Sequence, residues 1–147
     1  MSKAASKAYS KLSTGKLSGW SEKSFEAPGH GTIMGKMFLQ DQLQLTGCQI
    51  SINSYAPGES MPIHHSHKEN EEVYIFLSGK GQMQIDGETF DVAEGDVVRV
   101  ATGVDRIWRN NGAEVMTYLV MQVREGSLNQ CNMGDAIIPE KAVSWPV

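Results

Sequence analysis

The chain has 147 residues, of which 40% are hydrophobic and 20% are charged, and this length suits a single domain that buries its own core. Its formal net charge of −4 provides no broad basic field, so nucleic acid is not an expected partner. No apolar run approaches the roughly 18 residues of a membrane-spanning helix, so no membrane partner is expected. Residues 1–20 lack the apolar centre of a secretory signal, which predicts a cytoplasmic protein.

From about residue 43 onward, short runs rich in Val, Ile, Tyr and Phe alternate with Gly, Asp and Asn, a rhythm typical of all-β proteins. Eight such runs indicate an antiparallel β-barrel or jelly roll. The expected strands are Gln49–Tyr55, Met61–His67, Glu72–Leu77, Gly81–Ile85, Glu88–Val92, Val97–Ala101, Asp105–Asn110 and Val115–Val123.

Two turns are expected between these strands. Asp86 and Gly87 form the dipeptide that suits a two-residue hairpin, because both positions tolerate a positive φ. A second turn at Asn110–Gly112 is predicted to join the flanking strands in the same manner. Along the strands, the side chains of Tyr74 and Phe76 share the parity of Glu72 and are expected to point inward with it.

The barrel is expected to span residues 41–123. Residues 1–40 are expected to form an N-terminal arm that is partly flexible or docks on the barrel. Residues 124–147 carry Asn, Gly, Asp and Pro and are expected to form a tail packed on the barrel. The expected anchors of this tail are Ile137, Ile138 and Trp145.

Three of the four histidines of the chain lie within residues 64–67. Residues two apart on a strand point to the same side, so His65 and His67 can converge while His64 faces the other way. Glu72 opens the next apolar run and can place a carboxylate beside the two imidazoles. This set predicts a divalent-metal site with positions open to substrate or O₂. The alternative is an exposed histidine-rich loop without a metal, and a register shift that replaces one ligand by His64 is a further possibility.

Two segments resemble the motifs of the cupin superfamily. Residues 58–79 are similar to the first motif, G(x)5HxH(x)3-4E(x)6G, with one extra residue before His65. Residues 95–110 are similar to the second motif, G(x)5PxG(x)2H(x)3N, with Ala101 in place of the proline. Arg106 stands where this motif has the remaining metal-binding histidine. The resemblance is to small single-domain cupins of the conserved-barrel type, and it implies a cupin-type barrel, also described as a double-stranded β-helix.

The resemblance implies less about function than about fold. Cupins include metal-dependent dioxygenases, isomerases, decarboxylases and lyases as well as storage and sugar-binding proteins, which leaves open whether this protein is an enzyme. Of the four usual ligands the chain keeps His65, His67 and Glu72, which are expected to hold a divalent transition metal, namely Fe, Mn, Ni, Co, Cu or Zn. By analogy with the family, a homodimer is expected.

Arg106 separates two hypotheses. In the first, Arg106 binds the anionic group of a small-molecule substrate beside a three-ligand metal centre, and Tyr74 or Gln84 reaches the same substrate, as in a metal-dependent oxygenase or isomerase. In the second, Arg106 pairs with Glu72 in a metal-free pocket of a non-catalytic small-molecule-binding or structural cupin. A direct pair between the two side chains favours the second hypothesis, and an Arg106 that faces open space favours the first.

Overall fold

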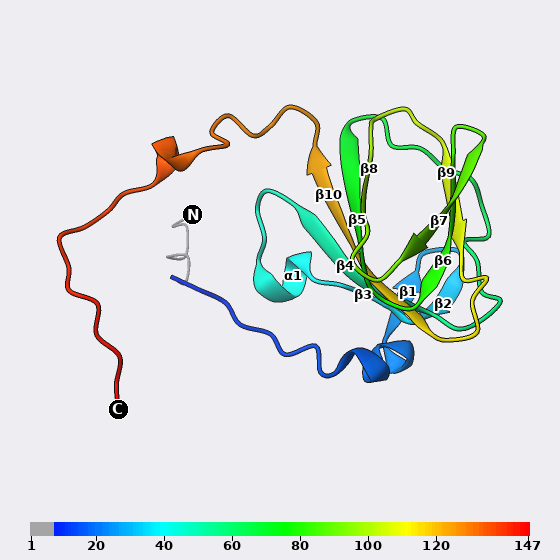
Figure 1. Cartoon of the computed structure of the whole chain (residues 1–147), viewed down its shortest axis with the longest axis horizontal. Coiled ribbons are helices and arrows are strands. Elements are labelled where there is room, and N and C mark those ends of the chain that lie inside the picture. Colours follow the sequence, from blue (N-terminus) through cyan, green and yellow to red (C-terminus); the bar gives the residue numbers. More distant parts are fainter. Residues whose placement is uncertain (1–7) are drawn as a thin grey trace.

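The computed structural model describes residues 8–147 and contains two antiparallel β-sheets that enclose the core (Figure 1). The larger sheet consists, in spatial order, of β3 (Lys36–Phe38), β4 (Gln49–Tyr55), β10 (Met116–Arg124), β5 (Asn70–Ser78) and β8 (Val97–Val100). The smaller sheet consists of β7 (Glu88–Ala93), β6 (Lys80–Ile85) and β9 (Arg106–Arg109). All their strand pairs are antiparallel, which confirms the predicted all-β barrel.

The hydrophobic core lies between the two sheets because alternate residues along each strand point into the barrel. Tyr74 and Phe76 on β5 are 0% and 1% exposed, which confirms the inward direction expected for them. Met83 on β6 and Trp108 on β9 belong to the same cluster, so both sheets contribute to one core. This core supports Glu72, the next inward residue on β5, which is 3% exposed.

Seven of the eight predicted strands are present, and their ends lie within two residues of the predicted ones. The exception is the segment Met61–His67, where the prediction of a regular strand is wrong. This segment runs beside β9 but shares with it a single isolated bridge, between His65 and Arg106, and a backbone hydrogen bond from Met61 to Trp108 at 2.9 Å. Pro62 lies within the segment and cannot donate a backbone hydrogen bond, which interrupts a regular ladder.

The predicted hairpin at Asp86 and Gly87 is confirmed. Their φ values are +50° and +83°, as a two-residue turn with two left-handed positions requires. The turn places Ile85 opposite Glu88 and thereby fixes the register between β6 and β7.

The second predicted hairpin is wrong, because β9 and β10 belong to different sheets. The turn at Asn110 instead carries the chain across from the smaller sheet to the larger one. The Asn110 amide donates to the backbone carbonyls of Tyr55 and Glu114, both at 2.8 Å, and its Oδ1 accepts from the Gly112 N–H at 2.9 Å. These bonds hold the crossing loop in place of a hairpin ladder.

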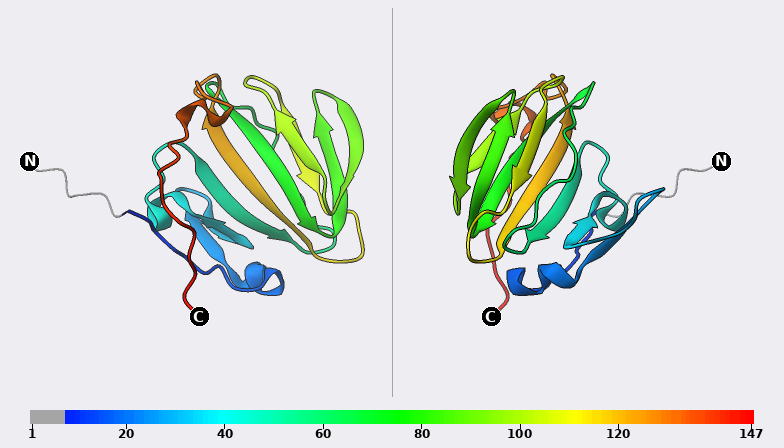
Figure 2. Two further views of the ribbon diagram at one scale, coloured as in Figure 1. Left: turned by 60° about the vertical axis from the view of Figure 1, so that its left-hand side comes forward. Right: turned by 90° about the vertical axis from the view of Figure 1, so that its right-hand side faces the viewer.

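The N-terminal region contributes directly to the barrel. It contains η1 (Leu17–Glu22), β1 (Ser24–Ala27), β2 (Gly31–Met34) and, after β3, the short helix α1 (Gln40–Leu43). Strand β3 pairs with β4 and places Lys36 opposite Asn53, so part of the expected arm lies at the edge of the larger sheet (Figure 2). Residues 1–7 of that arm lie outside the described residues. In the described part, no helix is long and apolar enough to cross a membrane.

The C-terminal segment differs from the expectation. After β10 it extends away from the barrel and includes only the short 3₁₀ helix η2 (Met133–Asp135) (Figure 1). The three expected anchors do not pack on the barrel: their exposures are 92% for Ile137, 81% for Ile138 and 84% for Trp145. A few apolar side chains spaced among polar residues bury too little area to offset the entropy lost when such a segment becomes ordered.

Gly79 joins β5 to β6, where the chain passes between the sheets, and its φ is +73°. A Cβ at this position would lie 2.5 Å from the Val115 carbonyl oxygen and 2.8 Å from the Met116 Cα. We expect Gly79→Ala to lower the free energy of unfolding in urea by about 3 kcal/mol or more, because a backbone clash adds to left-handed strain. The control is Gly95→Ala, where φ is +90° and no described atom lies within 4 Å of the added Cβ. Equal losses in the two variants would contradict the close-approach explanation.

Candidate metal centre

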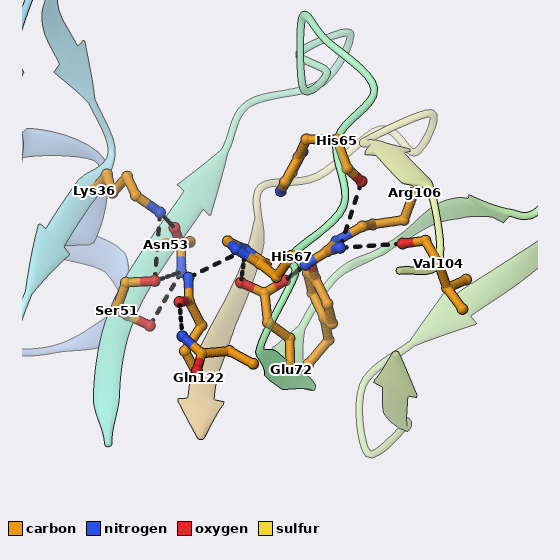
Figure 3. Close-up of polar contacts among 11 residues, drawn as sticks. Lys36, Ser51, Asn53, His65, His67, Glu72, Val104, Arg106 and Gln122 are labelled. Atoms are coloured by element: carbon orange, nitrogen blue, oxygen red, sulfur yellow. Dashed lines mark hydrogen bonds and ion pairs between the residues drawn. The ribbon is translucent and has the colours of Figure 1, made fainter. Parts of the chain in front are cut away.

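The candidate ligands come from an irregular segment and an adjacent strand. His65 and His67 precede β5, and Glu72 lies on it. The position of His65 is fixed by β9, because the Arg106 N–H donates to the His65 carbonyl at 3.1 Å. One donor atom from each of the three ligands lies within 4.8 Å of the other two (Figure 3). The convergence predicted from the spacing is therefore present.

The two carboxylate oxygens of Glu72 have different partners. Oε2 accepts a hydrogen bond from the Tyr74 hydroxyl at 2.6 Å and forms an ion pair with Nη2 of Arg106. Oε1 lies 3.0 Å from Nε2 of His67. One oxygen is thus held inside the barrel wall, while the other belongs to the cluster of candidate ligands.

The charge state of Glu72 follows from these contacts. Burial disfavours the carboxylate and by itself raises its pKa, but the hydrogen bonds from Tyr74 and Arg106 and the charge of Arg106 outweigh this effect. The net result is a pKa below the ordinary value of 4.5. Glu72 is therefore an anion at neutral pH, which is the form that ligates a metal.

Arg106 is 1% exposed and uses its donors inside the protein. Its Nη1 donates to the carbonyls of Val104 at 3.2 Å and His65 at 3.4 Å, and its Nε donates to the Tyr74 hydroxyl at 3.4 Å. Of the two arrangements that the sequence left open, the structure contains the direct pair with Glu72. Arg106 is not itself among the residues that line the cavity, although its partner Glu72 is.

Two other candidates for substrate contact also point elsewhere. Tyr74 is 0% exposed, and its hydroxyl bonds to Glu72 and Arg106. Burial and the nearby carboxylate raise the pKa of this phenol, so it remains a neutral donor. Gln84 donates to the Thr89 hydroxyl on the neighbouring strand at 3.3 Å, outside the cluster of candidate ligands.

His67 lies between a donor and an acceptor. Its Nε2 is 3.3 Å from the amide nitrogen of Gln122 and 3.0 Å from Oε1 of Glu72. The Gln122 amide is oriented by Asn70, which donates to its Oε1 at 3.1 Å. Nε2 either carries a proton that it donates to Oε1, or has one lone pair that accepts from Gln122. In the second case Nε2 and Oε1 would face each other as two acceptors at 3.0 Å, a contact that a cation between them would stabilise.

His65 has one nitrogen without a partner. Its Nδ1 is buried and makes no hydrogen bond with any described residue. Burial, followed by the charge of Arg106, lowers the pKa of His65 and favours the neutral imidazole that ligates metals. His64 points away as expected, and its Nδ1 lies 2.8 Å from Oδ2 of Asp105 at the surface.

These features fit a divalent transition metal. The donors are two imidazoles and one carboxylate oxygen within 4.8 Å of one another, a set that such metals accept. The orphaned Nδ1 of His65 is a buried polar atom that an ion or a water would satisfy. The hydrogen bonds that Glu72 receives from Arg106 and Tyr74 are of the kind that orient metal-bound carboxylates.

The three ligands line a cavity of about 180 Å³. Lys36 and Gln122 line it from the larger sheet and Trp108 from the smaller one. Sequence reasoning missed Lys36 and Gln122. Gln122 shares the inward parity of Val120 on β10, and this alternation was a usable signal. Lys36 offered no signal, because only the pairing of β3 with β4 brings it to the cavity.

The protein is a small jelly-roll barrel in which two histidines and a glutamate converge on one cavity, as potential metal ligands do. Comparison with known protein families identifies this class further: the family model of the cupin domain matches residues 52–122. A crystal structure of a cupin protein from Bacteroides fragilis is 35% identical, covers 91% of this chain and 99% of its own, and superposes with a TM-score of 0.74. The chain belongs to the cupin superfamily, and its cupin-type barrel is confirmed.

Two further relatives are more distant. A Cupin 2 conserved barrel domain protein from Salinispora arenicola is 23% identical over 61% of this chain and 75% of its own, with a TM-score of 0.55, and shows the fold alone. An uncharacterized protein of Methanocaldococcus jannaschii is 39% identical over 44 residues, or 30% of this chain. The match spans about a third of that protein, 35% of its length.

The buried ion pair leads to a stability prediction. Arg106→Met leaves the Glu72 carboxylate buried with Tyr74 as its main donor, and we expect a loss of about 3–5 kcal/mol in urea unfolding. The double variant Glu72→Gln/Arg106→Met removes both charges and should recover a large part of that loss. A double variant less stable than Arg106→Met would contradict the importance of the pair.

The lowered pKa of Glu72 leads to a pH prediction. A carboxyl group whose pKa is lower in the folded than in the unfolded state stabilises the folded protein at pH values above the unfolded-state pKa, here near 4.5. This contribution is lost as the pH falls through the folded-state pKa. We therefore expect the thermal midpoint of the wild type to fall below about pH 4.5 more steeply than that of Glu72→Gln. Parallel midpoint curves for the two proteins would show that Glu72 does not contribute to acid sensitivity.

Proposed function

We propose that this cupin binds a divalent transition metal through His65, His67 and Oε1 of Glu72, and that it exposes the remaining coordination positions to a small molecule in the cavity. The observation that supports this proposal best is the division of the Glu72 oxygens. Because Arg106 and Tyr74 occupy Oε2, Oε1 stays in the cluster of donors. The ion pair with Arg106 thus leaves Oε1 available to a metal ion, and Arg106 does not take the place of the metal.

The residues around the cluster would act as positioning residues. Arg106 and Tyr74 hold the carboxylate in its ionised form, and the Gln122 amide packs beside the His67 ring, 3.3 Å from its Nε2. When bound, a divalent metal in a two-histidine, one-carboxylate site polarises an oxygen of the bound molecule or activates O₂. A metal-dependent oxygenase or isomerase is the enzyme class that we propose. The homodimer and the cytoplasmic location stay predictions.

A second candidate function has a specific observation in its favour. The pair of Arg106 with Glu72 neutralises the carboxylate without any metal, and Nε2 of His67 at 3.0 Å from Oε1 also suits an ordinary hydrogen bond through a proton. In this case the protein would be a metal-free cupin that binds a small molecule without catalysis. The two functions differ in whether metal binds stoichiometrically.

The test uses full-length protein purified without an affinity tag. We expect the wild type to bind one Mn²⁺, Co²⁺ or Zn²⁺ per chain by elemental analysis and calorimetry, and to gain about 2.7 kcal/mol of stability at a metal concentration of 100 times Kd. The double variant His65→Ala/His67→Ala should lose both effects. His64→Ala is the matched control, because the imidazole of His64 pairs with Asp105 at the surface. This variant should bind metal like the wild type.

A wild type without stoichiometric metal after dialysis against each ion would reject the proposal and favour the metal-free function. Equal metal binding by the His64→Ala control and the double variant would place the metal elsewhere on the chain.

A further inference from the structure

We propose that Lys36 is the anion-binding residue of the cavity and that the molecule bound there carries a carboxylate. This inference rests on the proposed function, because the same cavity contains the candidate metal ligands. In this proposal Lys36 binds the anionic group of the ligand, the role that the sequence suggested for Arg106.

Lys36 reaches the cavity from the edge strand of the larger sheet. It lies on β3 opposite Asn53 of β4, and its side chain lines the same cavity as His65, His67 and Glu72. In Figure 3, the side chains of Lys36 and His65 extend toward this space from opposite sides. A ligand in the cavity can therefore contact the ammonium group at one end and the candidate metal centre at the other.

The hydrogen bonds of Lys36 leave one donor available. Its Nζ donates to Oδ1 of Asn53 at 2.8 Å and to Oγ of Ser51 at 3.4 Å, whereas an ammonium group has three donors. The two acceptors are themselves fixed, because the Asn53 amide donates to Oγ of Ser51 at 2.9 Å. The Phe38 ring lies beneath Nζ, with the ring centroid at 4.8 Å. These contacts hold the ammonium group in place, and its third donor has no partner among residues 8–147 and can bind a ligand.

The charges around the cavity also favour an anion. Glu72 is the one acidic side chain that lines it in the described structure, and its carboxylate is already paired with Arg106. The charge of Lys36 is therefore not compensated by a direct partner within the cavity. A bound divalent cation would add further positive charge, so a ligand with negative charge is the one that this cavity stabilises.

The protonation state of Lys36 agrees with this role. Burial lowers its pKa to about 8, against the opposing effect of the Glu72 carboxylate, which raises it. The ammonium form thus predominates at neutral pH. Partial removal from water also strengthens the attraction between an ammonium group and a carboxylate relative to an exposed pair.

The geometry points to a class of ligand. A carboxylate accepts a charge-assisted hydrogen bond from an ammonium group, and an oxygen donor elsewhere in the same molecule suits an open position on a divalent metal. A cavity of about 180 Å³ admits only a small molecule. Small carboxylic acids with a second oxygen-bearing group fulfil both conditions.

The experiment measures the binding of malonate, with its uncharged analogue malonamide as a control, by calorimetry at pH 7 in the presence and absence of Mn²⁺. We expect the wild type to bind malonate and to bind malonamide much more weakly. Lys36→Met should weaken malonate binding by about tenfold or more, the usual effect of losing a hydrogen bond to a charged group. Lys141→Met removes the same charge from the exposed tail and should leave malonate binding unchanged.

Lys36→Gln is the control for a folding defect. The glutamine amide can still donate a hydrogen bond to Asn53, but it lacks the charge of lysine. This variant should keep the thermal midpoint near that of the wild type and lose malonate binding as Lys36→Met does. Both variants should bind Mn²⁺ as the wild type does, since Lys36 is not a ligand.

The outcomes separate this inference from the proposed function. Malonate binding that depends on Lys36 in a protein without metal affinity would support the inference and reject the metal-dependent function. Metal binding together with malonate binding that is unaffected in both Lys36 variants would reject the inference alone. Equal affinities of the wild type for malonate and malonamide, or no malonate binding in either metal state, would also overturn it.

Discussion

The buried ion pair between Arg106 and Glu72 is the interaction on which the site depends. Glu72 lies on β5 of the larger sheet and Arg106 on β9 of the smaller one, so the pair joins the two halves of the barrel through its interior. A buried charge without a partner destabilises a protein by several kcal/mol, by about 3–5 kcal/mol where one partner is removed. Tyr74 reinforces the pair by bonding to both charges. The carboxylate is therefore fixed in position and charge before any ligand arrives.

This constraint determines how the remaining charges act. Because Arg106 neutralises Glu72 and does not itself line the cavity, the cavity presents the positive charge of Lys36 and the imidazoles of His65 and His67. The imidazoles and Oε1 of Glu72 form one end, where a metal fits, and the ammonium group forms the other. The two sets of groups are complementary, since a molecule with two oxygen-bearing ends can satisfy both.

Most of the barrel could be predicted from the sequence, because the alternation of apolar and polar residues reflects the two-residue period of a strand. The hairpin at Asp86 and Gly87 was predictable for a local reason as well, since few residue pairs tolerate two positive φ values. The predictions that the structure contradicts share a different cause. The segment Met61–His67, the turn at Asn110 and the tail from residue 124 depend on which strands lie beside them, and no local pattern encodes a neighbour that is distant in sequence.

The same distinction applies to the candidate site. From the sequence alone, the spacing of His65, His67 and Glu72 predicted that their side chains converge, and in the structure their donor atoms lie within 4.8 Å of one another. The two histidines nevertheless lie in an irregular segment and not in the strand on which the prediction relied. Only the tertiary structure decided the direction of Arg106 and the presence of Lys36 in the cavity. Arg106 could have faced a ligand or the carboxylate, and the choice depended on the packing of β9 against β5. Lys36 reaches the cavity through the hydrogen bonds between β3 and β4, a pairing that forms when the barrel is assembled.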